Sequence, residues 1–133
     1  MARGNLIAES IRIGGSVEAV PLTVEKVCRV EAGDESIGQP RVWTFIPFEV
    51  PDNDAAPLAD ALSAALEPVG DWYCDFRTAD ETFVVFFRRI FRYRRGDRAA
   101  RGEAEEYARS VGVRKDRSTG TSSNSQSPPV WAP

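Results

Sequence analysis

The chain has 133 residues, of which 42% are hydrophobic and 28% are charged, and its net charge at neutral pH is −3. This composition excludes a wholly disordered chain, and a domain of this length can bury a substantial core. The sequence contains no histidine, which excludes Ser–His and Cys–His catalysis and zinc sites that depend on histidine. No apolar run approaches the ~20 residues that a membrane-spanning helix needs.

Charge is divided unevenly along the chain. Residues 1–87 carry 6 basic and 15 acidic residues, whereas residues 88–133 carry 11 basic and 5 acidic residues. Such a division predicts either a basic half that binds polyanions or two halves that pair with each other within one fold. We favour the second interpretation, because most charged faces are simply solvated.

Two strands are predicted near the N-terminus. The apolar residues of Asn5–Ile13 recur at every second position, and a pair of glycines ends the run. Leu22–Glu31 also alternates, but Lys26 interrupts its apolar face and Val27 its polar face. This double interruption indicates a β-bulge within the second strand.

A third strand and a helix follow. Arg41–Val50 alternates, and Pro47, which has no amide hydrogen, places this strand at a sheet edge or at a bulge. Asp54 is a suitable N-cap for a helix that ends before Pro68. The predicted apolar stripe of this helix consists of Leu58, Leu62, Ala65 and Leu66.

Three more strands are predicted in the second half. Trp72–Arg77 alternates, with Trp72, Cys74 and Phe76 on one side, and Thr82–Phe87 is apolar on both faces, which is typical of a central, covered strand. Ile90–Arg94 alternates again, so Arg88 and Arg89 are expected to form a two-residue hairpin turn. Because tight turns favour positive φ, which arginine adopts reluctantly, Arg89→Gly is expected to be stabilising.

The last predicted element is a helix capped by Asp97, with an apolar stripe that ends at Val111. The resulting order βββαβββα, with short connections between strands, predicts an α+β fold. We expect two layers: a mainly antiparallel sheet of about five or six strands and two helices that cover one face. Residues 1–113 are predicted to form this single domain, and residues 114–133 a disordered tail.

The second half of the sequence resembles a family of small, uncharacterised bacterial proteins of a high-GC, actinobacterial type. The resemblance covers roughly residues 41–113, and the segments that carry it are Trp72–Phe76, Glu81–Phe86, Ile90–Asp97 and Glu103–Val113. It implies an α+β protein of the bacterial cytosol and no particular activity. The chain departs from the family in its hairpin turn, where the family tends to have glycine, and in its serine-rich C-terminus.

The two cysteines are interpreted as ordinary buried apolar residues, with a disulfide or a reactive thiol as the alternatives. Cys28 and Cys74 are far apart and have no metal-ligand spacing. The N-terminal residues lack the apolar run of a signal peptide, so we expect a cytoplasmic protein with reduced thiols. No phosphate-binding loop is present, and no metal or other cofactor is expected.

Two groups of residues could bind a partner. Residues 87–95 belong to a predicted hairpin in which arginines alternate with aromatic residues. A surface of this composition can bind single-stranded nucleic acid by stacking on the bases and by contacts to the phosphates. Asp71, Asp75, Asp80 and Glu81 surround the strand of Tyr73, and such carboxylates could serve an enzyme as acid and base. The simpler interpretation is a cross-strand pair between Asp75 and an arginine of the hairpin.

The sequence therefore favours a non-catalytic binding or protein-interaction module of the cytoplasm. Its partner is expected to be a protein or a small ligand, with no membrane involved. A nucleic-acid-associated protein that uses residues 87–95 is the alternative, and an enzyme with a carboxylate site near Asp75 is a third interpretation. The predicted partner-binding residues are Tyr73, Asp75, Arg92, Tyr93 and Arg94.

Overall fold

The computed structural model describes residues 1–33, 36, 39–69 and 72–111, so the predicted tail lies outside the described residues. The strands are β1 (Ala2–Ile7), β2 (Thr23–Val24), β3 (Cys28–Glu31), β4 (Val42–Val50), β5 (Cys74–Arg77), β6 (Glu81–Phe86) and β7 (Arg89–Arg94), and the helices are α1 (Ala55–Ala65) and α2 (Arg98–Ser110). These strands form one sheet in the spatial order β2-β4-β1-β5-β6-β7, and β3 also pairs with β4. The predicted α+β class with a mainly antiparallel sheet is confirmed.

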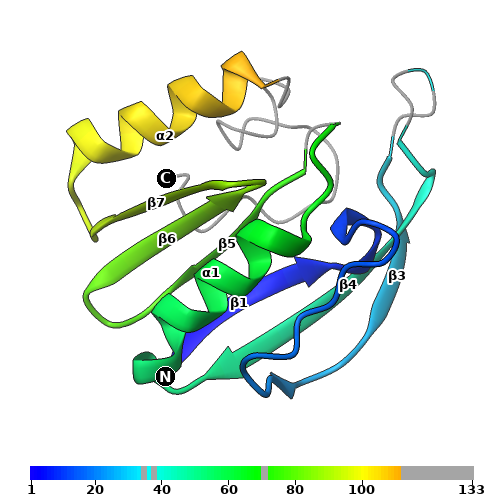
Figure 1. Cartoon of the computed structure of the whole chain (residues 1–133), viewed down its shortest axis with the longest axis horizontal. Helices are drawn as coiled ribbons and strands as arrows, with labels where there is room; N and C mark the ends of the chain where they lie inside the picture. The colour runs from blue at the N-terminus through cyan, green and yellow to red at the C-terminus, as the bar shows by residue number, and fades with distance from the viewer. Residues whose placement is uncertain (34–35, 37–38, 70–71, 112–133) are drawn as a thin grey trace.

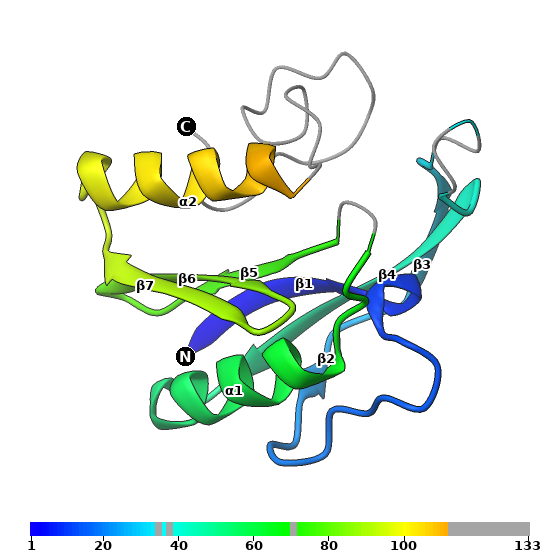
Figure 2. The ribbon, with the colours of Figure 1, turned by 45° about the horizontal axis from the view of Figure 1, so that its top comes forward.

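The two helices lie on opposite faces of the sheet rather than on one face. Phe83 and Val85 of β6 belong to the core cluster that contains α1, whereas Val84 and Phe86 belong to the cluster that contains α2. Figure 2 shows α2 above the sheet and α1 below it. The sheet is therefore a middle layer here, which explains why β6 is apolar on both sides.

The path of the chain through the sheet places β1 at its centre. Strand β1 pairs antiparallel with β4 on one side and with β5 on the other, so β4 and β5 run parallel to each other. Because parallel strands need a crossover connection, the segment between them contains α1. Figure 1 shows this helix crossing in front of the sheet.

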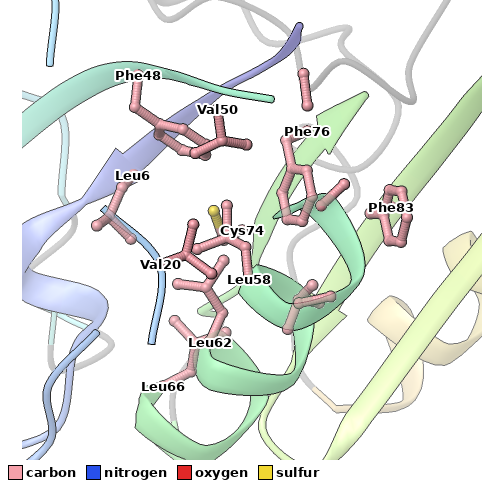
Figure 3. Close-up of a cluster of buried hydrophobic side chains, with 14 residues drawn as sticks. Leu6, Val20, Phe48, Val50, Leu58, Leu62, Leu66, Cys74, Phe76 and Phe83 are labelled. Atoms are coloured by element: carbon pink, nitrogen blue, oxygen red, sulfur yellow. The ribbon is translucent and has the colours of Figure 1, made fainter. Parts of the chain in front are cut away.

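The larger core cluster lies between α1 and the sheet. Leu58, Leu62 and Leu66 are buried and point toward the sheet, as Figure 3 shows. The rings of Phe76 and Phe83 stack there with their centroids 5.0 Å apart. The predicted stripe of α1 is therefore confirmed, although the Asp54 side chain accepts no capping hydrogen bond.

Small residues bring α2 close to the other face. Ala104 and Ala108 are buried against Val84, Phe86 and Phe91. Asp97 caps the helix as predicted, since its carboxylate accepts a hydrogen bond of 3.0 Å from the Ala100 amide. Val111, which was expected to continue the apolar stripe, is 42% exposed.

The predicted second strand is divided into β2 and β3. Val24 pairs with Phe48, whereas Cys28 pairs with Phe45, so the three residues 25–27 lie opposite two residues of β4. The carbonyl of Pro47 accepts a hydrogen bond from Glu25 at this point. In a strand, the amide and the carbonyl of one residue point to the same side. The nitrogen of Pro47, which carries no hydrogen, therefore faces the bulge, as the sequence predicts.

The first strand begins and ends earlier than predicted. It spans Ala2–Ile7 instead of Asn5–Ile13, and a 3₁₀ turn at Ala8–Ser10 follows it. The Glu9 carboxylate accepts hydrogen bonds from the amide and hydroxyl of Thr44, 2.6 and 2.9 Å long. The Glu9 side chain thus accepts a hydrogen bond that the main chain of a longer β1 would have accepted from β4. Hydrophobic alternation in the sequence gives no sign of this replacement.

Trp72 also differs from the prediction. It precedes β5, and its ring lies 5.2 Å from that of Trp43. These two residues form a third cluster with Ile7, separate from the one that contains Cys74 and Phe76. The chain adopts strand geometry after Trp72, so alternation along β5 does not extend to it.

The hairpin turn consists of Phe87 and Arg88, one residue earlier than predicted. Phe86 pairs with Arg89, so Arg89 belongs to β7. Arg88 has a φ of 58°, and its amide donates a hydrogen bond of 2.9 Å to the Ser63 carbonyl of α1. This contact between the turn and α1 holds the register, which local turn preferences could not predict.

Candidate functional site

The five predicted binding residues are divided between the two faces of the sheet. Tyr73, Asp75 and Tyr93 are buried on the α2 face, whereas Arg92 and Arg94 are exposed on the α1 face. The register places Asp75 opposite Val84, and Val84 opposite Phe91. The predicted pairing of Asp75 with Arg92 or Arg94 is therefore wrong, because alternation along β7 turns these arginines to the other face.

Arg92 instead forms an ion pair with Glu81. Its Nε and a terminal nitrogen donate to the two carboxylate oxygens of Glu81 over 2.8 and 2.9 Å. The guanidinium also lies over the ring of Phe83, 5.1 Å from the centroid. The hydrogen bonds lower the pKa of Glu81 and raise that of Arg92. Arg92 of β7 thus holds Glu81 of β6 in its charged form.

Two of the three aromatic residues in the range 87–95 are buried in the protein, and Phe87 is half-buried. Phe91 and Tyr93 are buried, and the Arg89 guanidinium lies 4.7 Å from the centroid of the Phe91 ring and 5.5 Å from that of Tyr107. The Arg88 guanidinium lies over the ring of Phe87. Bases stack on exposed rings, so this arrangement weighs against recognition of nucleic acid by residues 87–95.

A group of polar side chains lies on the α2 face and is called the α2 polar cluster below. Its members are Asn5, Asp75, Tyr93, Arg101 and Glu105. The pKa of the Tyr93 hydroxyl responds to the charges of Arg101, Asp75, Glu105 and Asp97. Arg101 and Glu105 also form an ion pair of 3.7 Å along α2. The cluster contains two of the five predicted residues, and Tyr73 lies on the same face.

Asn5 lies on the α2 face where β1 and β5 approach closely. A Cβ on Gly4 would lie 2.5 Å from the Phe76 Cβ and 2.7 Å from the Asp75 carbonyl oxygen, so no larger residue fits there. Gly4 pairs with Phe76, and the next step of that register places Asn5 opposite Asp75. Asn5 and Arg101 were not predicted, since a single polar residue in a strand or helix gives no sequence signal.

Three polar atoms of the cluster are buried without a hydrogen-bond partner in the structure. They are Oδ1 of Asn5, the hydroxyl of Tyr93 and Nε of Arg101. Most buried polar atoms in proteins have a partner, and leaving one unpaired costs about 1–3 kcal/mol. The cluster therefore holds unused capacity both to donate and to accept hydrogen bonds.

Two titratable side chains in or next to the cluster, those of Tyr93 and Cys74, have raised pKa values. Burial raises the pKa of Tyr93 to about 12, although the Arg101 charge opposes the rise. Burial and, to a smaller extent, the Asp75 charge raise the pKa of the Cys74 thiol well above its usual value. Both groups stay protonated at pH 7, so neither is an activated base or nucleophile.

The carboxylates expected around Asp75 are not brought together. Glu81 pairs with Arg92 on the α1 face, and Asp80 lies in the exposed turn before β6. Asp71 lies outside the described residues. No group of three metal-ligating side chains occurs within the part of the chain that the structure describes.

The remaining findings add no further site. None of the helices in the described ranges is long and apolar enough to cross a membrane. Comparisons with family models, curated proteins and solved structures found no match for this chain. The resemblance noted from the sequence stays a prediction, and function is inferred from the chemistry of the α2 polar cluster.

Proposed function

We propose that this protein is a non-catalytic binding protein and that it holds a small polar molecule at the α2 polar cluster. The observation that carries the proposal is the set of buried, unpaired atoms on Asn5, Tyr93 and Arg101. A molecule that supplies the missing hydrogen bonds recovers free energy that the protein alone forgoes. Binding at this position would also link α2 to the sheet.

The donors and acceptors define the chemistry of the ligand. Nε of Arg101 donates to an acceptor such as a carboxylate, whereas Oδ1 of Asn5 accepts from a donor such as an ammonium group. The Tyr93 hydroxyl can act in either sense, and its pKa responds to the charges of Arg101 and Asp75. This combination favours a small zwitterion, such as a free amino acid.

The neutral state of Tyr93 at pH 7 supports binding of a ligand without a catalysed reaction. A tyrosine that stays neutral at pH 7 can orient a ligand but cannot remove a proton from it. Within the cluster, the carboxylate of Glu105 is engaged by Arg101. The cluster therefore offers recognition and charge complementarity for a ligand.

The proposal is tested by thermal unfolding with a panel of free amino acids at millimolar concentration, measured on wild type, Tyr93→Phe and Tyr107→Phe. Tyr107 packs against Phe86 and Phe91 but is not part of the polar cluster, so its variant is the matched control. A ligand should raise the midpoint of wild type and Tyr107→Phe and have little effect on Tyr93→Phe. Equal stabilisation of both variants, or no stabilisation of wild type, would contradict the proposal.

A further inference from the structure

The outer edge of β3 has no strand beside it within the residues that the structure describes, and it carries its own pattern of charge. Among the strands of the described ranges, β3 pairs with β4 alone, and Figure 1 shows it along the outer side of the sheet. Arg29, Val30 and Glu31 are all exposed. An exposed strand edge presents main-chain donors and acceptors to a further strand.

The hydrogen bonds to β4 show which residues of β3 face outward. The Ala32 amide donates to the Arg41 carbonyl of the strand beside it. Because the direction alternates along a strand, Cys28 and Val30 also point inward, whereas the main-chain groups of Arg29 and Glu31 point away from the sheet. These two residues are separated by Val30 alone.

We propose that β3 pairs antiparallel with β3 of a second copy of this chain, around a two-fold axis at Val30. This register places Arg29 of each copy opposite Glu31 of the other, so each such pair exchanges both of its main-chain hydrogen bonds. An axis at Arg29 would oppose two arginines, and an axis at Glu31 would oppose two glutamates. Like charges directly opposite each other destabilise a sheet, so charge complementarity selects the axis at Val30.

The side chains at the axis agree with this register. Val30 is 38% exposed and lies beside Trp43, its partner in β4. Two copies of Val30 would face each other at the axis and cover this exposed apolar surface. The dimer joins two sheets edge to edge, and it does not depend on a ligand in the α2 polar cluster.

The mass of the full chain in solution tests the interface. The contact is one short strand, so light scattering should be followed up to roughly 1 mM protein. We expect a concentration-dependent dimer that Arg29→Glu or Glu31→Arg weakens roughly tenfold, because either change opposes like charges. The double variant restores the attraction and should dimerise like wild type.

The charge-reversal series separates the interface from a folding defect. Both positions are exposed, and circular dichroism should be unchanged in all three variants. A chain that stays monomeric at every concentration would overturn the proposal. So would a double variant that is as weak as the two single variants.

Cysteine cross-linking tests the register separately. In a Cys28→Ser background, where Cys74 is buried, Val30→Cys places two thiols across the axis. Such non-hydrogen-bonded pairs have Cα atoms about 4.5 Å apart, which a disulfide can bridge. Mild oxidation should link Val30→Cys into a dimer faster than Arg29→Cys. Faster linking of Arg29→Cys would show that the axis lies elsewhere.

Discussion

Arg88 is the one non-glycine residue with a positive φ within the described ranges. Its φ of 58° lies in the left-handed region, where the Cβ of an L-residue crowds the following carbonyl. The strain is retained because the amide of Arg88 bonds to the Ser63 carbonyl and because β6 and β7 pair on both sides of the turn. Arg88 thus keeps an unfavourable backbone conformation, and the hairpin turn contacts α1 through it.

Replacing Arg88 by glycine should therefore stabilise the protein by about 1 kcal/mol, since glycine adopts this φ without strain. The effect is measured as the free energy of unfolding from urea titrations. Arg89→Gly is the matched control, and it should be destabilising because Arg89 lies in β7 with its guanidinium over the ring of Phe91. Stabilisation by Arg89→Gly and not by Arg88→Gly would show that the turn lies one residue later.

At the scale of the elements, α1 is held by the stripe that its sequence predicts. Leu58 and Leu62 are fully buried, and Leu66 follows them directly after the helix ends. Pro57 lies in the first turn, where a missing amide hydrogen leaves no helix bond unmade. The helix thus contributes to stability through its packing against the sheet, as short helices do in general.

Leu62→Ala should lower the free energy of unfolding by about 2–5 kcal/mol, because it leaves a cavity between α1 and the sheet. Val69→Ala provides the control, since Val69 is 79% exposed and its truncation should change stability by less than about 0.5 kcal/mol. Chemical denaturation of both variants gives the comparison. A loss below 1 kcal/mol for Leu62→Ala would mean that the helix packs more loosely than the structure indicates.

At the scale of the whole molecule, helices on both faces bury polar groups that one covering layer would leave wet. Tyr93 lies on an edge strand, yet it is only 8% exposed because α2 covers it. The same coverage encloses Arg101 Nε and the carboxyl of Asp75. The α2 polar cluster is thus produced by the layering of the fold and by no single segment.

This burial predicts a loss of stability at alkaline pH. The Tyr93 pKa is about 12 in the folded protein and about 10 in the unfolded chain. Between these values the folded state holds a proton that the unfolded state has lost, so stability falls as pH rises from about 10 to about 12. Tyr93→Phe removes this contribution, so its unfolding free energy should fall less steeply over that range.

The comparison uses denaturant titrations of both proteins at several pH values from about 9 to about 12. The raised pKa of the Cys74 thiol has the same sign and is shared by both proteins, so it cancels in the difference. Parallel curves for wild type and Tyr93→Phe would contradict a buried, protonated Tyr93.

Local pattern alone was enough to predict much of the fold. The stripe of α1, the Asp97 cap, the bulge opposite Pro47 and the covered strand β6 all depend on neighbours within one or two turns or strand steps. Hydrophobic periodicity and the missing donor of proline act over this short range. The sequence therefore determined the class of the fold and the identity of most elements.

The tertiary structure alone decided which side chains meet. Alternation shows that Arg92 and Tyr93 point to opposite sides of β7, but not which side α2 covers or where Asp75 lies. The register through β5, β6 and β7 aligns Asp75 with Phe91 on the α2 face, away from Arg92, and the charges of Asp75 and Arg101 both act on Tyr93. The site residues are far apart in sequence, and their meeting depends on strand order and on helices on opposite faces, which no local pattern encodes.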